Sequence, residues 1–314
     1  MTPSADGASA TRPNSKKYRF TAVTGYFKHD SEPIGPPFES ITLPSLGLIN
    51  KPYPSDSSLP ARSAGYTPWE RFTHHLSTLN QDSPPSITYK LLYYTRHGQG
   101  YHNVQESKVG TIEWERYWAR LDGDGNTTWA DAHLTSVGED QAKAVNKFLL
   151  EESSTDTDSE MGILPLPTRH YVSPLTRCLQ TWELAYKGIR FEGKPLVKEM
   201  VRERLGIHTC DRRSFKSEIE KYFGDGKFVF EEGFTEKDEL WVPDVRESIG
   251  EHAARIHRFL EDVFEDGGDG DDQIVGVTAH SGSGLALYEL IGHPSVRLAP
   301  GTLVPVLVRG ERFG

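Results

Sequence analysis

The chain is organised around one stretch, LLYYTRHGQGYHN, which spans Leu91–Asn103. Its first residues continue an apolar, β-branched and aromatic run from Ile87, which is typical of a buried strand. The strand pattern ends at Arg96-His97-Gly98. Placing an arginine and a histidine at the end of a buried strand is costly unless an anion binds them. The stretch therefore predicts a strand that delivers both side chains to a ligand site.

The loop after this strand is suited to a phosphate group. Gly98 and Gly100 allow the backbone to approach a ligand closely, and Asn103 can donate a hydrogen bond from the far side of the loop. This composition predicts a phosphoryl pocket built around His97 as the nucleophile. Asn103 is a candidate phosphate-binding residue, and Gln99 and Gly100 are candidate substrate-binding residues.

A second cation follows another strand. The run His170–Val172 predicts a short buried strand, and we expect Ser173 to cap a helix that has Pro174 at its first position. Arg177 then lies in the first turn, where the positive end of the helix dipole already favours an anion. We interpret Arg177 as a second phosphate clamp; the alternative is a surface arginine paired with a glutamate.

These motifs resemble the histidine phosphatase superfamily, specifically its phosphoglycerate mutase-like branch. The chain has the Arg-His-Gly tripeptide at 96–98, the Ser-Pro-x-x-Arg-x-x-Gln-Thr motif at 173–181 and, at the end of a further strand, His280. The resemblance covers residues 87–308. It implies that Glu203, which lies between two arginines after a predicted strand, is the proton donor to the leaving group.

The expected chemistry follows from the charge of a phosphate monoester. The dianion repels anionic nucleophiles, so a neutral His97, with its other ring nitrogen held by a backbone carbonyl, would attack phosphorus. Arg96 and Arg177 would bind the equatorial oxygens, and His280, expected to be cationic beside them, would add a donor. Water would then hydrolyse the phosphohistidine with Glu203 as base. This reaction needs no cofactor and no metal ion.

Two departures from the family pattern bear on the reaction. Gly100 stands where many relatives place a hydroxyl donor to phosphate, and Ser281-Gly282-Ser283 replaces the Gly-Asn-Ser that mutases commonly carry. These differences favour a phosphomonoester hydrolase acting on a small phosphorylated metabolite. Phosphoglycerate mutase-type phosphoryl transfer and a non-catalytic binder of phosphorylated ligands remain as alternatives.

A basic segment, His208–Arg213, follows Glu203 in an otherwise acidic chain. Arg212 and Arg213 are candidates for binding a second anionic group of the substrate. The alternative is a solvated turn before a helix expected over 214–223. The aromatic and acidic segment 228–241 predicts a lid or loop.

Alternating apolar strands and helices predict a three-layer α/β/α sandwich with a mostly parallel central sheet. We expect residues 1–18 to be disordered, 19–86 to form an irregular extension packed on the main domain, and 87–314 to form the histidine phosphatase domain. Since the polar residues collect at the carboxyl ends of strands, one pocket should be assembled from several segments. Further strands are expected at 195–201, 274–279 and 303–308, and helices at 69–79, from 136, at 244–264 and at 285–291.

Composition narrows the class of protein. The chain has 314 residues, of which 36% are hydrophobic, enough for one large domain with a sizeable core. The net charge of −10 argues against nucleic-acid partners and against adhesion to anionic membranes. No segment has the apolar length needed to span a bilayer, and no signal peptide is visible. We expect a soluble, cytoplasmic protein, or a secreted one if a leader has been removed.

Three other patterns are rejected. The segment from Asp122 begins like a calcium loop but lacks the glycine at its sixth position and the glutamate at its twelfth. His97 and His102 are separated by a glycine loop and do not share a helix face, unlike typical zinc ligands. Ser281 follows a strand as a nucleophilic serine would, but no Asp follows it to complete a triad.

Overall fold

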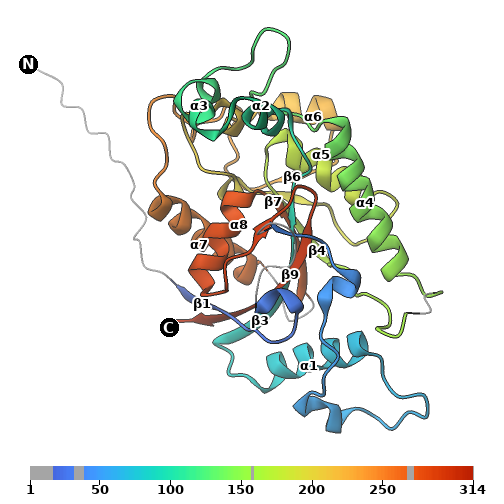
Figure 1. Ribbon diagram of the computed structural model, residues 1–314. Coiled ribbons are helices and arrows are strands. Elements are labelled where there is room, and N and C mark those ends of the chain that lie inside the picture. Colours follow the sequence, from blue (N-terminus) through green and yellow to red (C-terminus); the bar gives the residue numbers. More distant parts are fainter. Residues whose placement is uncertain (1–16, 32–38, 157–158, 267–271, 314) are drawn as a thin grey trace, which may run out of the picture.

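The computed structural model describes residues 17–31, 39–156, 159–266 and 272–313. The disorder expected for residues 1–18 therefore concerns, up to residue 16, a segment outside the described ranges. A seven-stranded sheet forms the centre, with helices on both faces (Figure 1), and its strand order is β1-β9-β3-β7-β4-β5-β6. The strands are β1 (Tyr18–Ala22), β3 (Ile87–Arg96), β4 (Arg169–Val172), β5 (Leu196–Val197), β6 (Val229–Phe230), β7 (Ile274–Ala279) and β9 (Leu303–Arg312).

The sheet is mostly parallel, as the alternation of strands and helices predicts. β3, β7, β4, β5 and β6 run in one direction, whereas β9 is antiparallel to both of its neighbours, β1 and β3. A separate pair, β2 (Glu39–Ser40) and β8 (Arg297–Leu298), forms a small parallel sheet. The predicted α/β/α fold is therefore confirmed, and the loops that follow the parallel strands open at one edge of the sheet.

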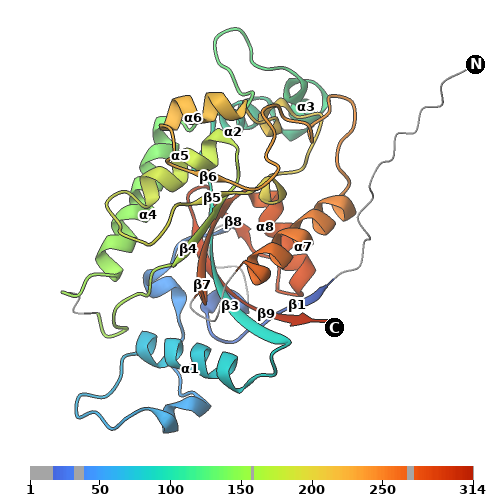
Figure 2. The same ribbon diagram turned by 180° about the vertical axis from the view of Figure 1, so that it is seen from behind.

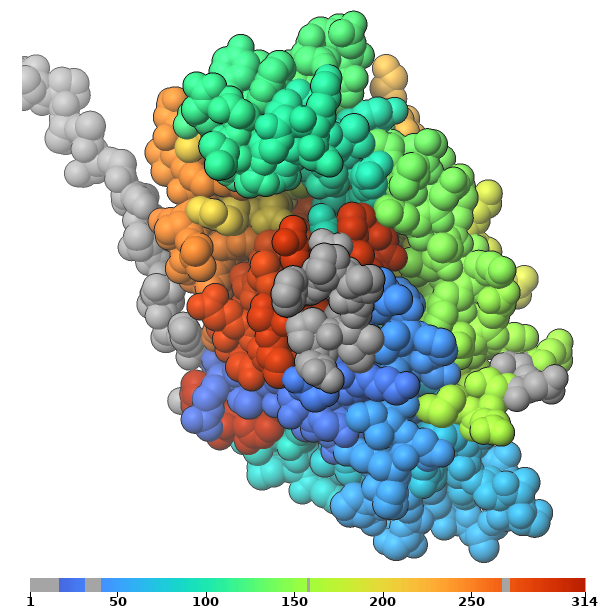
Figure 3. Space-filling view, viewed as in Figure 1, coloured from blue at the N-terminus to red at the C-terminus, as the bar shows by residue number. Residues whose placement is uncertain are grey.

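Helices cover both faces of this sheet. α7 and α8 lie on one face and α4 and α5 on the other (Figures 1 and 2). α1 lies at the opposite end of the molecule from α2 and α3, and the same separation is seen on the surface (Figure 3). In the described part of the chain, no helix has both the length and the apolar composition for crossing a membrane. The helices are α1 (Pro68–Asp82), α2 (Tyr101–Val109), α3 (Thr111–Arg116), α4 (Ser136–Glu152), α5 (Thr176–Ala185), α6 (Lys216–Phe223), α7 (Ile249–Glu265) and α8 (Ser281–Ile291).

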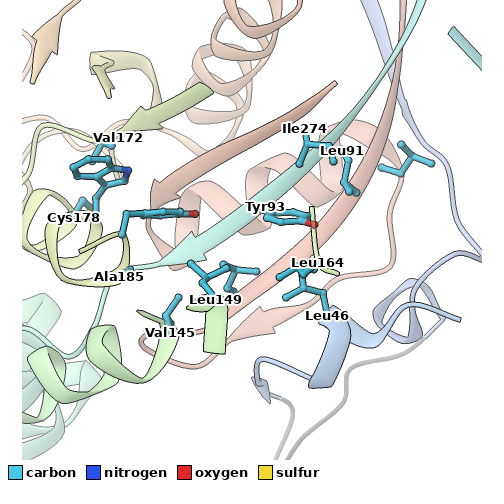
Figure 4. Close-up of a cluster of buried hydrophobic side chains, with 14 of the residues drawn as sticks. Leu46, Leu91, Tyr93, Val145, Leu149, Leu164, Val172, Cys178, Ala185 and Ile274 are labelled. Atoms are coloured by element: carbon cyan, nitrogen blue, oxygen red, sulfur yellow. The ribbon is translucent and has the colours of Figure 1, made fainter. Parts of the chain in front are cut away.

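Two apolar cores follow from the alternation of side chains along β3. Leu91 and Tyr93 join the core that also contains side chains of α4 and α5 (Figure 4). Leu92 and Tyr94 join the core formed with α7 and α8. Successive side chains of a strand face opposite sides of the sheet. An uninterrupted apolar run is therefore what a strand buried on both faces requires.

The residues before β3 are more ordered than the irregular extension expected from the sequence. Tyr18–Ala22 pairs along β9 as an edge strand, so the central sheet begins before the expected start of the main domain. Phe27, Trp69 and Phe72 are fully buried in the core that also receives Leu91 from β3. The extension is therefore part of the same folded body.

Several element boundaries differ from the sequence expectation. The helix expected from Asp244 begins at Ile249. The strand expected over 195–201 is reduced to β5, followed by a short 3-10 helix. α4, in contrast, begins at Ser136 as expected, and the side chain of Thr135 caps it by accepting a backbone N–H.

Candidate active site

Three adjacent parallel strands deliver the residues that follow them to one edge of the sheet. β3, β7 and β4 pair in register up to their carboxyl ends. His97, Ser173 and His280 are the residues immediately after these strands. The backbone N–H of His97 donates to the carbonyl of Ala279 at 3.0 Å, which continues the ladder into the site. Segments far apart in the sequence therefore meet at one place.

His97 is buried and held in one tautomer. Its Nδ1 lies 2.7 Å from the carbonyl of Gly98, as expected, and its Nε2 accepts from Nε of Arg177 at 3.3 Å. Burial, with the charges of Arg177 and Arg96, lowers the pKa of His97 well below its usual value. Arg96, also buried, donates through Nη1 to the carbonyl of Leu298 at 2.6 Å. The imidazole of His97 is therefore neutral, and the lone pair on its Nε2 lies beside a guanidinium group.

Arg177 lies in the first turn of α5, but the local structure differs from the expectation. Leu175 occupies the N-cap position and Ser173 does not cap the helix. The guanidinium is fully buried and forms an ion pair with Asp211, with Nη2 and Oδ1 3.0 Å apart. Nη1 donates to the carbonyl of Cys210. These contacts fix the guanidinium while its Nε faces Nε2 of His97.

His280 lies beside His97, with ring centroids 5.2 Å apart. Its Nδ1 is 3.3 Å from Nη2 of Arg177, and because a guanidinium only donates, Nδ1 accepts. The proton is then on Nε2, 2.8 Å from Oγ of Ser173. Burial, then Arg177, lowers the pKa of His280 well below its usual value. Desolvation and the neighbouring arginine thus favour a neutral ring in the structure, whereas the sequence interpretation expected a cationic His280 beside bound phosphate.

The loop between β3 and α2 is held by its own side chains. The Asn103 side-chain oxygen accepts the backbone N–H of Gly100 at 3.0 Å. The side-chain oxygen of Gln99 accepts from the hydroxyl of Thr135 at 2.9 Å. Gln99 is thus tied to the cap of α4, and the amide oxygen of Asn103 shapes the loop. The amide NH2 group of Asn103 is the part suited to donate to a phosphate.

Glu203 lies against the first turn of α8. Its Oε2 accepts the backbone N–H of Gly282 at 2.8 Å, and its Oε1 accepts that of Arg204 at 3.0 Å. A Cβ added to Gly282 would lie 1.9 Å from Oε1, so the carboxylate occupies the space of a side chain at that position. The helix terminus favours a negative charge there. A carboxylate bound by backbone donors is available for proton transfer.

The comparisons with known proteins agree with this geometry. The model of the histidine phosphatase superfamily (branch 1) matches residues 92–299. The chain belongs to this superfamily. A probable phosphoglycerate mutase of Arthroderma benhamiae is 38% identical over 296 residues, which are 93% of this chain and 84% of that protein. Phosphomutase-like protein 3 of Candida albicans is 37% identical over 224 residues, 71% of this chain and 67% of that protein.

Among solved structures, the phosphoglycerate mutase of Bacillus anthracis str. Sterne has 16% sequence identity and a TM-score of 0.43, covering 70% of this chain and 88% of that one. The curated relatives place the chain in the phosphoglycerate mutase-like branch of the superfamily. Membership in this superfamily makes the protein an enzyme of phosphoryl transfer.

Arg212 lies at the surface of this superfamily member. Its Nη2 donates to Asp122 at 2.8 Å, and its guanidinium lies over the ring of Trp241, 5.1 Å from the centroid. The side chain is 37% exposed. Arg212 is therefore accessible to an anion, although it already has an acidic partner.

Arg213 does not have the expected role in substrate binding. Its side chain is buried and forms an ion pair with Glu199. Its Nη2 donates to the carbonyls of Thr235 at 2.8 Å and Lys237 at 2.9 Å, and Nη1 donates to that of Ser214 at 3.0 Å. Protein acceptors take up both terminal nitrogens and Nε. Arg213 thus anchors the segment predicted as a lid, which corrects the sequence interpretation.

Asp211 is a site residue that the sequence analysis missed. Its carboxylate pairs with Arg177 at 3.0 Å and with Arg246 at 2.9 Å. Burial alone would raise the pKa of Asp211, but Arg246 and Arg177 outweigh it and lower the pKa. His208 and Cys210 also offer ligand atoms within 4.8 Å of this carboxylate. Two guanidinium groups on one carboxylate disfavour a metal ion there, so Asp211 positions Arg177. Its one sequence signal is that it is the only acid in the run 208–213.

Proposed function

We propose that the protein is a phosphomonoester hydrolase that acts through a phosphohistidine on a small phosphorylated metabolite. One observation carries the proposal: the Nε2 lone pair of His97 is fixed by the Nδ1 contact with the Gly98 carbonyl and lies 3.3 Å from Nε of Arg177. A neutral imidazole in a cationic pocket is the nucleophile that a phosphate dianion can approach.

In the first step, an oxygen of the substrate's phosphoryl group accepts the hydrogen bond that Nε of Arg177 donates to His97. The lone pair on Nε2 of His97 is then free to attack phosphorus. Arg96 and Arg177 bind the equatorial oxygens, where charge is spread in the transition state. The dianion raises the pKa of the neighbouring His280, whose Nδ1 then carries a proton and donates to the phosphoryl group. The NH2 group of Asn103 closes the cradle.

Glu203 completes both half-reactions. It enters the first step as the carboxylic acid and gives its proton to the oxygen of the leaving alcohol as the bond to phosphorus breaks, which leaves the carboxylate for the second step. In the second step the carboxylate takes a proton from water, the water oxygen attacks phosphorus, and the bond to Nε2 of His97 breaks to release inorganic phosphate. The contact of Glu203 with the backbone N–H of Gly282 holds the carboxylate at the helix terminus through both steps.

Mutase-type transfer is the second candidate, because a relative 38% identical to the chain is named a probable phosphoglycerate mutase. Against it stands Gly282, where mutases commonly carry asparagine. A side chain there would overlap the carboxylate of Glu203, since a Cβ would lie 1.9 Å from Oε1. We therefore favour transfer to water over transfer to a second hydroxyl.

The test is phosphorus NMR of the purified protein with p-nitrophenyl phosphate and, separately, with 3-phosphoglycerate. Release of inorganic phosphate from both substrates, together with an acid-labile phosphohistidine in quenched samples, is the expected result. Isomerisation of 3-phosphoglycerate without phosphate release would assign the mutase reaction. Binding without turnover of either compound would assign the non-catalytic alternative. His97→Ala is the control that must form no phosphoenzyme.

A further inference from the structure

His102 is a buried imidazole without a partner, close to the nucleophile. The residue lies in the first turn of α2 and is 8% exposed. Its ring centroid is 5.5 Å from that of His97. Neither ring nitrogen has a hydrogen bond to another described residue, and Nδ1 is shielded from solvent. A buried polar atom without a partner is unfavourable, and at a site it indicates a missing ligand.

The ring of His102 fills the space of a side chain at position 100. A Cβ added to Gly100 would lie 2.7 Å from Nδ1 and 2.8 Å from Cε1 of that ring. The backbone of Gly100 has φ −98° and ψ 163°, which any residue can adopt. Glycine is therefore needed here for space and not for conformation. In many members of the superfamily a hydroxyl donor to phosphate stands at this position.

The electrostatic surroundings of His102 also suit an anion. Burial, followed by the charges of Arg177 and of the neighbouring His97 and Arg96, lowers the pKa of His102 well below its usual value. The ring is therefore neutral and carries one N–H donor. An oxygen of a phosphoryl group would satisfy this donor and at the same time be attracted by both arginines.

We propose that His102 is a further phosphate-binding residue, which donates its imidazole N–H to a non-bridging oxygen of the phosphoryl group and so replaces the hydroxyl that Gly100 lacks. The inference rests on the proposed function, because its ligand is the group that His97 would accept. It adds a contact that the superfamily's Arg-His-Gly motif does not include.

The test exchanges the two donors. His102→Ala is expected to weaken binding of orthovanadate, measured by isothermal titration calorimetry, by about tenfold or more, as for the loss of a hydrogen bond to a charged group. Gly100→Ser alone should cause a similar loss, because the new side chain displaces the ring. The double variant Gly100→Ser/His102→Ala places a hydroxyl in the vacated space and should recover most of the binding.

Two controls separate a phosphate contact from a structural role. His133→Ala removes an exposed imidazole bonded to Gln180 and should bind orthovanadate within about twofold of wild type. His102→Asn keeps an N–H donor and should bind better than His102→Ala. Thermal unfolding of each variant establishes that it is folded before titration.

The outcomes distinguish this inference from the proposed function. Unchanged orthovanadate binding in folded His102→Ala would overturn the role of His102, whether or not the wild type hydrolyses p-nitrophenyl phosphate. A double variant that is folded but as weak as His102→Ala would overturn the replacement of the hydroxyl. A wild type that binds orthovanadate but hydrolyses nothing would overturn the proposed function, and the His102 comparison would still be decided by binding.

Discussion

Arg177 and Arg213 are both buried arginines on neighbouring segments, yet their guanidinium groups face different partners. Arg213 pairs with Glu199 and donates to a series of backbone carbonyls. Arg177 has one carboxylate partner, Asp211, and turns its Nε toward Nε2 of His97. Arg213 belongs to a buried ion network, which we define as Glu199, Arg202, Arg213 and Asp238. The pocket around His97 holds the other arginine.

The two arginines differ in the groups to which their guanidinium N–H donors are bonded. In the ion network, each arginine is neutralised by carboxylates: Arg202 contacts Glu199 at 2.8 Å and pairs with Asp238 through Nη2. Around His97 the imidazoles are neutral, and the carboxylate of Asp211 is shared between Arg177 and Arg246, so two guanidinium groups with one carboxylate leave a net positive charge. We therefore expect arginines of the first kind to stabilise the fold and those of the second kind to bind the phosphate group of the proposed substrate.

The largest expected effect is at the nucleophile. His97→Ala should lower kcat for p-nitrophenyl phosphate by about 10⁴-fold or more, because alanine has no lone pair to form the phosphoenzyme. Because the ring is buried, its truncation leaves a cavity and should lower the thermal midpoint by a few degrees while the variant stays folded. Steady-state assays with calorimetric unfolding check both statements. A variant that retains more than a tenth of the activity would exclude His97 as the nucleophile.

The second test compares two glutamates, one in each region. Glu203→Gln should lower steady-state kcat by about 10²–10⁴-fold, because water attack on the phosphoenzyme loses its base. Rapid mixing with p-nitrophenyl phosphate should still show a burst of p-nitrophenol, since this leaving group needs no proton. Glu199→Gln, the matched change in the ion network, should keep kcat and lower the unfolding midpoint. The reverse pattern would break the comparison.

The third test changes the two arginines themselves. Arg177→Lys should lower kcat/KM by about 10²–10³-fold, because an ammonium cannot give the planar set of donors to phosphate oxygens. Arg213→Lys should leave kcat/KM within about threefold and lower the free energy of unfolding by about 2–4 kcal/mol, because it breaks a buried pair. Assays and urea unfolding of both variants measure this. Equal effects on catalysis would show that Arg213 belongs to the pocket.

The smallest expected effect concerns a histidine that is buried but lies outside the candidate site. His170 is buried like His97 but contacts the rings of Trp182, Tyr186 and Phe191. Burial lowers the pKa of His170 to about 3. Between this value and about 6.5, the unfolded chain binds a proton that the folded protein excludes. Above about pH 6.5 the burial of neutral His170 therefore has no effect on the pH dependence of stability. Below it, this residue lowers the free energy of unfolding by about 1.4 kcal/mol per pH unit.

His170→Phe removes that proton linkage. From pH 7 to pH 5, the free energy of unfolding of the variant should fall by about 2 kcal/mol less than that of wild type. Its kcat at pH 7 should be unchanged. Urea titrations at pH 7, 6 and 5 measure the slope. Parallel curves for the two proteins would mean that His170 is protonated in the folded state.

The sequence was sufficient for the elements whose pattern is fixed by burial. The run from Ile87 to Arg96 and the run Ile274–Ala279 are apolar on both faces, and both are strands with the predicted limits. The chemistry at the ends of these strands followed, because parallel strands must open at one edge. His97, Arg177 and His280 accordingly lie together.

Sequence reasoning was less successful where partners distant in the sequence determine the orientation or protonation of a side chain. Arg212 and Arg213 are neighbours in the basic run, and only the fold reveals that one faces outward and the other meets Glu199. The protonation of His280 depends on burial and on Arg177, neither of which is visible in its local sequence. Ser173 was expected to cap α5 but contacts His280, since the helix begins later.

The superfamily match begins at residue 92, but one face of the strand that carries the nucleophile packs against an earlier part of the chain. Leu46, Trp69 and Phe72 share a core with Tyr93, and Figure 4 shows Leu46 and Tyr93 in this cluster. A fragment trimmed to residues 92–299 would lose this covering and also β9, which pairs with β3, and would therefore expose apolar side chains and an open edge of the sheet. Residues outside the matched region thus complete the core and the sheet, and shortened versions of the chain should aggregate.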